Sequence, residues 1–287
     1  MSFELAYQKL DALVQRHLAT DEYDWVQEKL NATLQGPSAR ELFMAHGQMS
    51  TKIAAAPLDD SLLEQDGLEA YLRGQKADTC QLARIYLLHA VLRSNPEFFE
   101  PKVAKLIEVA DSRELETFLK FLVVLPNPEA FKFTAVEALR TNISTVFNAI
   151  SMDNPYPSLY FDEQQWNQMY LKAAFMGQDL SRIRDVEKRA NAQLARIISD
   201  YAHERWAASR EIDPLFWRPV TTFMSAGILE DMQRLLQSDN AMENKAAALC
   251  CHHSGSQEAA TLLDAYPVLK QKIVDQEVTW HNIKDSV

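Results

Sequence analysis

Glycine is scarce in this sequence, which has 7 glycines among 287 residues, whereas ordinary usage is roughly 7%. Phosphate-binding loops and tight hairpin turns need residues that tolerate positive φ, so the scarcity argues against both. The Gly-x-Ser-x-Gly, P-loop and dinucleotide-binding fingerprints do not occur. The sequence therefore contains no complete catalytic or cofactor motif, and we expect no cofactor.

Positive charge is also in short supply. Lys and Arg number 29 against 40 Asp and Glu, which gives a net charge of −11. A protein that binds nucleic acid through its phosphates usually carries a basic excess. We therefore expect no nucleic-acid partner, and we interpret the acidity as a source of solubility.

Long apolar runs are missing as well. A helix that spans a membrane needs about 18 consecutive apolar residues, and the sequence contains no such run. Near the N-terminus Glu4, Lys9 and Asp11 interrupt the apolar residues, unlike the core of a signal peptide. Three cysteines in a chain of this length do not suggest a disulfide framework. These absences predict a soluble cytoplasmic protein that does not insert into a membrane.

The segment Cys250-Cys251-His252-His253 resembles a metal site in composition only. Successive residues of a helix point in different directions, whereas structural zinc sites use spacings such as Cys-x₂-Cys. His252 and His253 near a helix C-terminus favour an interaction with the helix dipole instead. We predict no metal site.

Good helix formers, among them Leu, Ala, Gln, Glu, Arg and Met, dominate what is present. Apolar residues recur with a period near 3.6, which is typical of α-helices. Residues 78–93 are apolar on most faces and predict a central buried helix. The predicted fold class is all-α, either an irregular helical repeat of the HEAT-like α-solenoid kind or a compact multi-helical bundle.

Prolines divide the chain after an expected helix over residues 129–150. Asn154-Pro155 and Tyr156-Pro157 restrict the residue before each proline to extended conformations. We predict an N-terminal helical half over residues 1–150, a proline-rich extended connection over 151–160 and a C-terminal helical half over 161–287. One continuous domain is the alternative.

Polar and aromatic side chains concentrate over residues 140–218. One helix begins here at its cap residue Asp162, and a second, longer helix is expected over residues 186–210. On the second helix Trp206 and Arg210 are four positions apart, so we expect a cation–π contact between them.

The functional interpretation of this region is a pocket for a small anionic or aromatic metabolite. Arginine suits carboxylate and phosphate because its planar guanidinium presents parallel N–H groups. The predicted pocket residues are Arg140, Asn142, Asn154, Tyr156, Trp166, Asn167, His203, Arg205, Arg210, Trp217 and Arg218. The alternative is an interhelical network, in which the tryptophans are core residues and the arginines pair with Asp200, Glu204 and Glu211. The residues alone leave both interpretations open.

His203 raises the further alternative of an enzyme that acts on a small polar metabolite, in which His203 works with Glu204 or Arg205. A zinc protease of the His-Glu-x-x-His type is excluded because position 207 is Ala. Consecutive helical residues lie about 100° apart around the axis, which counts against a shared ligand. We therefore expect no catalytic residues, and His203 and Glu204 stay the catalytic pair of the alternative.

Several segments resemble the EboA family. The likeness is strongest in residues 137–142 (EALRTN), 153–157 (DNPYP), 161–163 (FDE), 166–169 (WNQM), 171–173 (LKA), 189–191 (RAN), 194–196 (LAR), 200–208 (DYAHERWAA) and 216–218 (FWR). It continues more faintly in residues 82–84, 125–128, 245–249 and 279–280. The sequence departs from the family pattern at Ser209, where Gly is usual, and over residues 185–188, which lack an expected Gly-Leu.

The resemblance implies a protein of a bacterial gene cluster that accompanies certain secondary-metabolite pathways. In such clusters EboA-like proteins occur beside a prenyltransferase-like membrane protein and several proteins that resemble metabolic enzymes. The implied role is traffic or export of a secondary metabolite or its precursor, as an adaptor or as a metabolite-binding protein. The implied partners are other proteins of the cluster, and the resemblance supplies no catalytic residues.

Overall fold

The computed structural model describes residues 6–36, 38–65 and 67–285, and in these ranges the regular structure is helical. In the described part of the chain, β-type pairing is limited to an isolated bridge between Pro57 and Asp78. The predicted all-α class is confirmed. The chain divides into two compact units, Met1–Tyr160 and Phe161–Val287.

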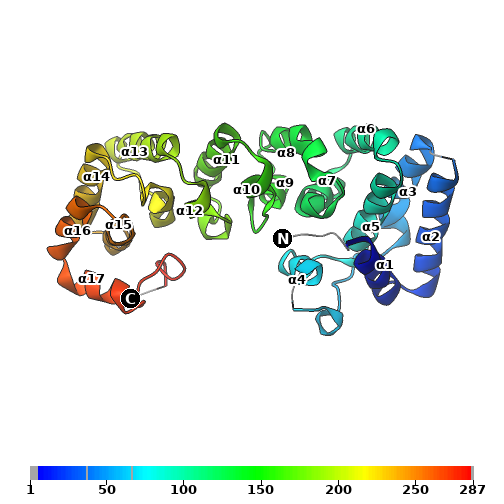
Figure 1. Cartoon of the computed structure of the whole chain (residues 1–287), viewed down its shortest axis with the longest axis horizontal. Helices are drawn as coiled ribbons and strands as arrows, with labels where there is room; N and C mark the ends of the chain where they lie inside the picture. Colours follow the sequence, from blue (N-terminus) through cyan, green and yellow to red (C-terminus); the bar gives the residue numbers. More distant parts are fainter. Residues whose placement is uncertain (1–5, 37, 66, 286–287) are drawn as a thin grey trace. The chain divides into compact units, whose positions relative to one another are not determined.

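The first part of the N-terminal unit packs around one buried helix, and α8, α9 and α10 lie beyond it (Figure 1). Its helices are α1 (Ala6–His17), α2 (Thr20–Gln35), α3 (Ala39–Lys52), α4 (Gly67–Gly74), α5 (Thr79–Ser94), α6 (Pro96–Glu108), α7 (Ser112–Phe121), α8 (Lys132–Ala138), α9 (Ser144–Ser151) and α10 (Tyr156–Tyr160), with 3-10 turns η1 (Asp60–Leu62), η2 (Leu122–Val124) and η3 (Pro128–Phe131). Helix α5 is buried along most of its length, and α1, α2, α3, α6 and α7 pack against it. The predicted buried helix over residues 78–93 is confirmed, because a helix that is apolar all round must be enclosed by others.

The C-terminal unit also surrounds one helix. Its elements are α11 (Glu163–Phe175), η4 (Leu180–Arg182), α12 (Val186–Arg189), α13 (Ala192–Ala207), η5 (Pro214–Val220), α14 (Ala226–Leu236), α15 (Ala241–His253), α16 (Gln257–Asp264) and α17 (Pro267–Val274). Helix α15 contacts η5, α14, α16 and α17, and its residues 245–251 are buried. Ala246, Ala247 and Ala248 have small side chains, so neighbouring helices can approach the axis of α15 closely. Each unit thus has the layout of a multi-helical bundle, and stacking of helix pairs as a repeat stays a prediction.

The expected helix over residues 129–150 is wrong in its middle. The structure has η3, α8 and α9 in this range, and residues 139–143 lie outside the helices. Oγ1 of Thr141 accepts a hydrogen bond from the backbone N–H of Ile143 at 3.1 Å. Local side-chain bonds of this kind compete with the helical ladder, and here they leave Arg140 and Asn142 in a loop.

The expected extended connection over residues 151–160 is wrong at its C-terminal end, where the chain forms α10. Oδ1 of Asn154 accepts a hydrogen bond from the backbone N–H of Tyr156 at 2.9 Å. Pro157 falls in the first turn of α10, where the missing N–H of a proline costs no helical hydrogen bond. The prolines therefore introduce a short helix instead of prolonging the connection.

The expected helix over residues 186–210 is two helices, α12 and α13. Asn191 caps α13, since its Oδ1 accepts a hydrogen bond from the backbone N–H of Leu194 at 2.8 Å and its own φ of −149° is extended. The cap satisfies one of the donors that a helix start leaves open. The predicted site residues His203 and Arg205 therefore lie on α13, in its second half.

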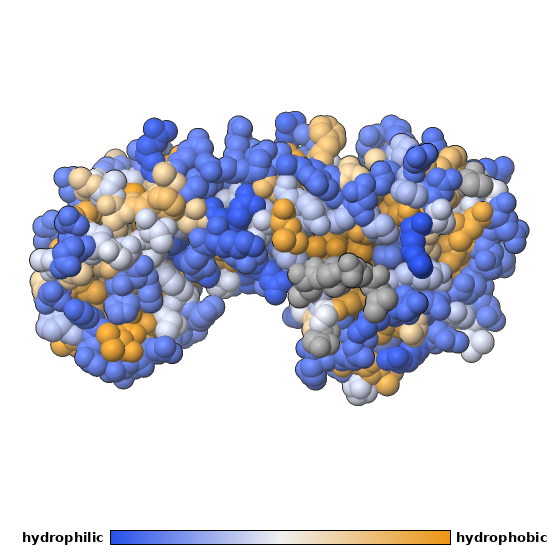
Figure 2. Space-filling model, viewed as in Figure 1, coloured by the Kyte–Doolittle hydropathy of each residue, from blue (hydrophilic) through white to orange (hydrophobic). Residues whose placement is uncertain are grey.

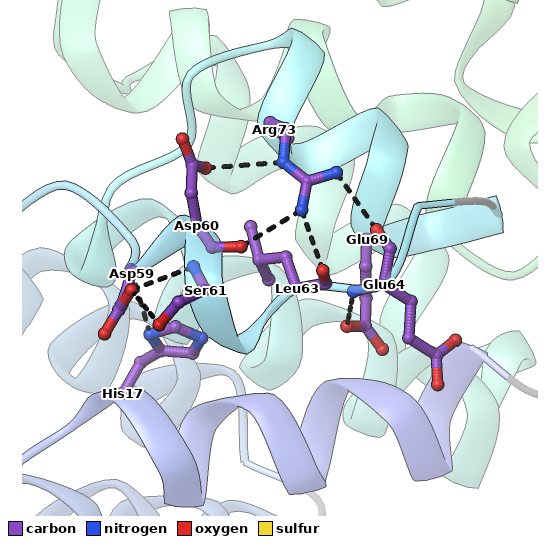
Figure 3. A network of polar contacts seen from close by, with 8 residues as sticks. All are labelled: His17, Asp59, Asp60, Ser61, Leu63, Glu64, Glu69 and Arg73. Atoms are coloured by element: carbon purple, nitrogen blue, oxygen red, sulfur yellow. Dashed lines mark hydrogen bonds and ion pairs between the residues drawn. The ribbon is translucent and has the colours of Figure 1, made fainter.

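Arg73 ties α4 to the segment that precedes it (Figure 3). Its guanidinium donates to the backbone carbonyls of Asp60 at 3.2 Å and Leu63 at 2.8 Å, and it pairs with the Asp60 carboxylate at 3.4 Å. It also donates at 3.1 Å to the carbonyl of Glu64, whose N–H is bonded to the Glu69 carboxylate at 2.7 Å. One guanidinium therefore holds a segment that has little regular structure beyond η1.

The surface is mostly hydrophilic on the face seen in Figure 2, with small hydrophobic patches among charged side chains. Among the described residues the most exposed large apolar ones are scattered: Val109 follows α6, and Phe133, Phe175 and Val268 lie on α8, α11 and α17. Scattered apolar residues of this kind are ordinary on protein surfaces. None of the helices formed by the described residues is long and apolar enough to cross a lipid bilayer.

Candidate functional site

Arg140 and Asn142 lie on the surface of the N-terminal unit, in the loop between α8 and α9. Arg140 forms an ion pair with Glu137 at 3.1 Å. An exposed pair contributes about 0–1 kcal/mol to stability, so it does not hold the guanidinium in one geometry. The binding role of Arg140 and Asn142 stays a prediction.

Asn154 and Tyr156 are core residues of the same unit. Nδ2 of Asn154 donates to the carbonyls of Leu119 at 3.0 Å and Ala149 at 2.8 Å. The hydroxyl of Tyr156 donates to the carbonyl of Pro128 at 2.9 Å, and burial raises the pKa of this tyrosine above its ordinary value. Both side chains use their polar groups inside the unit, which supports the structural interpretation for them.

Trp166 and Asn167 connect α11 with the start of α13. Asn167 and Asn191 bond reciprocally, each Nδ2 donating to the other's Oδ1, at 3.2 and 2.8 Å. The Arg189 guanidinium lies 5.0 Å from the ring centroid of the buried Trp166, a cation–π contact, and donates to the carbonyl of Phe161 at 2.8 Å. These contacts join three segments of the C-terminal unit and again favour a structural role.

His203 bonds to a carboxylate on another helix. Its Nε2 lies 2.6 Å from Oδ1 of Asp231 on α14, while Glu204 is exposed. Ser199, one turn earlier on α13, donates to Oδ2 of Asp231 at 2.5 Å. Asp231 is 3% exposed, and two side-chain hydrogen bonds offset the cost of burying it. The serine donates to the aspartate, so this is not the arrangement in which a histidine activates a serine.

Three rings, those of His203, Trp206 and Trp217, contact one another in a row. The rings of His203 and Trp206 are 5.4 Å apart, and Trp206 stacks on Trp217 at 5.7 Å with an interplanar angle of 22°. The expected contact between Trp206 and Arg210 is wrong, because the guanidinium that covers Trp206, at 4.2 Å, belongs to Arg234 of α14. Arg210 is exposed. Packing of α14 against α13 supplies a cation that spacing along one helix could not reveal.

Arg205 caps the segment that follows α13. Its Nε and Nη2 both donate to the backbone carbonyl of Glu211, at 3.1 and 2.6 Å. Arginine near a helix C-terminus often binds carbonyls in this way. The interhelical alternative expected pairing with the carboxylates of Asp200, Glu204 and Glu211, whereas Arg205 binds the main chain of Glu211.

Arg218 lines a cavity within the C-terminal unit. The cavity has a volume of about 300 Å³, near the lower end of the range found for small-molecule sites. We refer to it as the Arg218 cavity, and its lining residues are Glu187, Ala190, Arg218, Pro219, Thr221, Thr222, His253 and Trp280. Elements α12, η5 and α15 and the segment after α17 contribute to its wall.

The Arg218 guanidinium and the Glu187 carboxylate form a two-point contact in this cavity. Nε lies 2.5 Å from Oε1 and Nη2 lies 3.0 Å from Oε2. The Arg218 side chain is 12% exposed and the Glu187 side chain 52% exposed. A paired fork of this kind is the geometry that arginine uses for carboxylates and phosphates. Glu187 thus occupies the face of the guanidinium that can bind an anion.

His253 and Trp280 add an imidazole and an indole to the wall of the Arg218 cavity. Burial lowers the pKa of His253, the charge of His252 lowers it further, and Glu187 acts in the opposite direction. His253 is therefore mostly neutral at pH 7 and can accept or donate a hydrogen bond. Trp280 is partly buried and supplies an aromatic surface with an indole N–H.

The sequence interpretation placed Arg218 in a site but not Glu187, His253 or Trp280. Glu187 and Arg218 are 31 positions apart, and neither a motif nor a period connects them. Asp231 could have been recognised from the sequence pattern, because it interrupts the buried apolar stripe of α14. A carboxylate on such a stripe needs partners, which His203 and Ser199 provide.

The two adjacent cysteines are core residues. Sγ of Cys250 donates to the carbonyl of Trp217 at 3.4 Å. Burial raises the pKa of both thiols, that of Cys251 to about 11, so they stay protonated at neutral pH. Within residues 6–36, 38–65 and 67–285, no group of three or more His, Cys, Asp and Glu side chains is placed to hold a metal ion.

The structure defines an all-α protein with a metabolite-sized cavity lined by a paired arginine, a histidine and a tryptophan. The family model described as metabolite traffic protein EboA matches residues 6–221. The chain therefore belongs to the EboA family, which confirms the resemblance seen in its sequence. Glu187 and Arg218 lie inside the matched residues, and His253 and Trp280 lie beyond them. No curated protein and no solved structure matches the chain.

Proposed function

We propose that this protein binds a small polar metabolite in the Arg218 cavity as part of metabolite traffic. The observation that carries the proposal is the Arg218–Glu187 fork beside Trp280 in a cavity of about 300 Å³. The guanidinium favours a carboxylate or phosphate on the ligand, and the indole favours an apolar or aromatic body. The family description supports the traffic role.

The finer role that we infer is that of a cytoplasmic binding protein or adaptor for a secondary metabolite or its precursor. It would pass the metabolite to other proteins of the same gene cluster for export. Among the predicted pocket residues, Arg218 is the one on which this proposal depends. We also propose that the two units correspond to the predicted helical halves, residues 1–150 and 161–287. The Arg218 cavity lies in the second half.

Glu187 gives the proposal a distinctive test. An anionic ligand must displace the Glu187 carboxylate from Arg218 or share the guanidinium with it. Replacing Glu187 by Gln removes the competing charge, so Glu187→Gln should tighten the binding of an anion. Arg218→Gln should weaken it, because the charge-assisted hydrogen bonds are lost. Opposite effects from the two members of one ion pair are hard to explain by a change in folding.

The experiment uses benzoate and phenyl phosphate as probes in calorimetric titrations of the full-length protein. We expect saturable binding that Arg218→Gln weakens about tenfold or more, the size of one charge-assisted hydrogen bond. Arg210→Gln is the matched control, because Arg210 is an exposed arginine of the same unit. Equal losses in Arg218→Gln and Arg210→Gln, or weaker binding by Glu187→Gln, would argue against the Arg218 cavity as the site. Thermal unfolding of each variant checks that it is folded.

A further inference from the structure

A second cavity lies in the N-terminal unit, where the first turns of α5 and α7 meet. Its volume is about 400 Å³, and it is distinct from the Arg218 cavity. We refer to it as the Arg84 cavity, and the residues of its wall that bear on ligand chemistry are Asp78, Gln81, Arg84, Arg113, Glu116 and Thr117. Apolar side chains, Ile53, Ala55 and Cys80, form the rest of the wall together with Ser50.

Arg84 is a buried cation on this wall, with a relative exposure of 4%. Its Nη2 donates to Oε1 of Glu114 at 3.2 Å, and the same oxygen lies 3.5 Å from Nδ1 of His46. The hydrogen bond from His46 is the first cause that lowers the pKa of Glu114, so the carboxylate stays charged and fixes Arg84. The buried Nε of Arg84 has no hydrogen-bond partner among the described residues. An unused donor on a buried guanidinium is costly unless an acceptor reaches the group.

The acidic residues around the cavity already have partners, whereas one cation does not. The Asp78 carboxylate caps α5 by accepting from the N–H of Gln81 at 2.8 Å. Glu116 pairs with Lys120 at 2.7 Å. The exposed guanidinium of Arg113 makes no hydrogen bond or ion pair with any described residue. Two guanidinium groups and two carboxylates therefore line the cavity, and Arg113 is the one among these four whose side chain has no partner among the described residues.

We propose that the Arg84 cavity binds a small oxyanion, a carboxylate or a phosphate group, between Arg84 and Arg113. Arg84 is held in place by Glu114, and Arg113 on the first turn of α7 is free to close on the anion. Gln81 adds a donor, because its Oε1 accepts from the N–H of Asp78 at 3.2 Å and its NH₂ group remains available. This proposal does not depend on the Arg218 cavity, which lies in the other unit.

The test is a calorimetric titration of the full-length protein with inorganic phosphate and, separately, with succinate. The informative variant is Arg113→Gln, which removes an exposed and unpaired side chain and therefore leaves the fold intact. Arg40→Gln is its control, because Arg40 is also an exposed arginine of the N-terminal unit and is not on the cavity wall. We expect Arg113→Gln to raise the Kd of at least one anion about tenfold, and Arg40→Gln to leave it within about twofold.

The same titrations in the Arg218→Gln background separate this site from the Arg218 cavity. The effect of Arg113→Gln should persist there, even if binding of aromatic anions at Arg218 is lost. The proposal is overturned if neither anion binds saturably to the wild type, or if Arg113→Gln and Arg40→Gln weaken binding equally. A preference for phosphate or for succinate identifies the head group that the site takes.

Discussion

At the scale of single residues, a guanidinium group lines each of the two cavities proposed as binding sites. The Arg218 side chain is 12% exposed and has Glu187 across its fork. Arg84 is 4% exposed and has Glu114 on one nitrogen, with its Nε unsatisfied. Arginine does not lose its charge in proteins, so a buried guanidinium has to find acceptors. A cavity beside such a group is a place where a ligand can supply one.

Asn154 shows the opposite case, a buried polar side chain whose groups are all used by the chain. We expect Asn154→Ala to lower the free energy of unfolding by about 2–4 kcal/mol, because it deletes hydrogen bonds to three backbone groups in a buried setting. Urea unfolding followed by circular dichroism measures the change. Asn142→Ala, at an exposed loop position, should stay within about 0.5 kcal/mol of the wild type. Equal effects of the two substitutions would contradict a structural role for Asn154.

At the scale of elements, α5 and α15 decide how each unit is put together. Both helices are enclosed by neighbours, and both carry polar residues into the interior. On α5 these include Arg84 and His89, and on α15 they include Lys245. Small and apolar residues make up most of the rest of each helix. Polar groups on such a helix must be paired, neutral or next to a cavity.

His89 on α5 predicts a pH dependence of stability. Burial, followed by the charge of Arg93, lowers the pKa of His89 from 6.5 to about 4. Between these two values the unfolded chain binds a proton that the folded chain does not, so stability falls as the pH drops through this window. From pH 7 to pH 5 the expected loss is about 2 kcal/mol.

Urea unfolding at pH 7 and pH 5 tests this assignment. The variant His89→Gln cannot titrate at this position, so it should lose less stability than the wild type between the two pH values, by about the same 2 kcal/mol. The control His281→Gln replaces an exposed histidine and should follow the wild type. A wild-type pH dependence that survives in His89→Gln would assign it to other groups.

At the scale of the whole molecule, each unit has its own buried helix and hence its own core. The family match over residues 6–221 ends inside the C-terminal unit, after η5, so it does not follow the division into units. Units with separate cores can in principle fold alone. The Arg84 cavity belongs to the first unit and the Arg218 cavity to the second.

Separate expression of residues 1–160 and 161–287 tests the independence of the units. We expect each fragment to give a helical circular dichroism spectrum and a cooperative thermal transition. The second fragment should also keep the binding of benzoate or phenyl phosphate, because it contains every residue of the Arg218 cavity. Two unfolded fragments would show that the cores depend on each other.

Local patterns predicted much of this architecture. The 3.6-residue period and the abundance of helix formers predicted an all-α chain, and the apolar run over residues 78–93 predicted α5. Asp162 caps the start of α11, as expected, and Gln165 completes the capping box. Helix continuity was less predictable, because single side chains such as Thr141 and Asn191 end or restart a helix by bonding to nearby backbone. Those bonds compete closely with the helical ladder, and the outcome depends on the packing of each segment.

The sequence by itself determined the class of the fold, the family and the abundance of arginine and tryptophan over residues 140–218. Only the tertiary structure decided which of these side chains share a space. It placed Glu187, His253 and Trp280 around Arg218 and put Asp231 beside His203. The physical reason is that periodicity shows which face of a helix is buried but not which neighbour covers it. Contacts between elements far apart in sequence therefore appear only once the helices have packed.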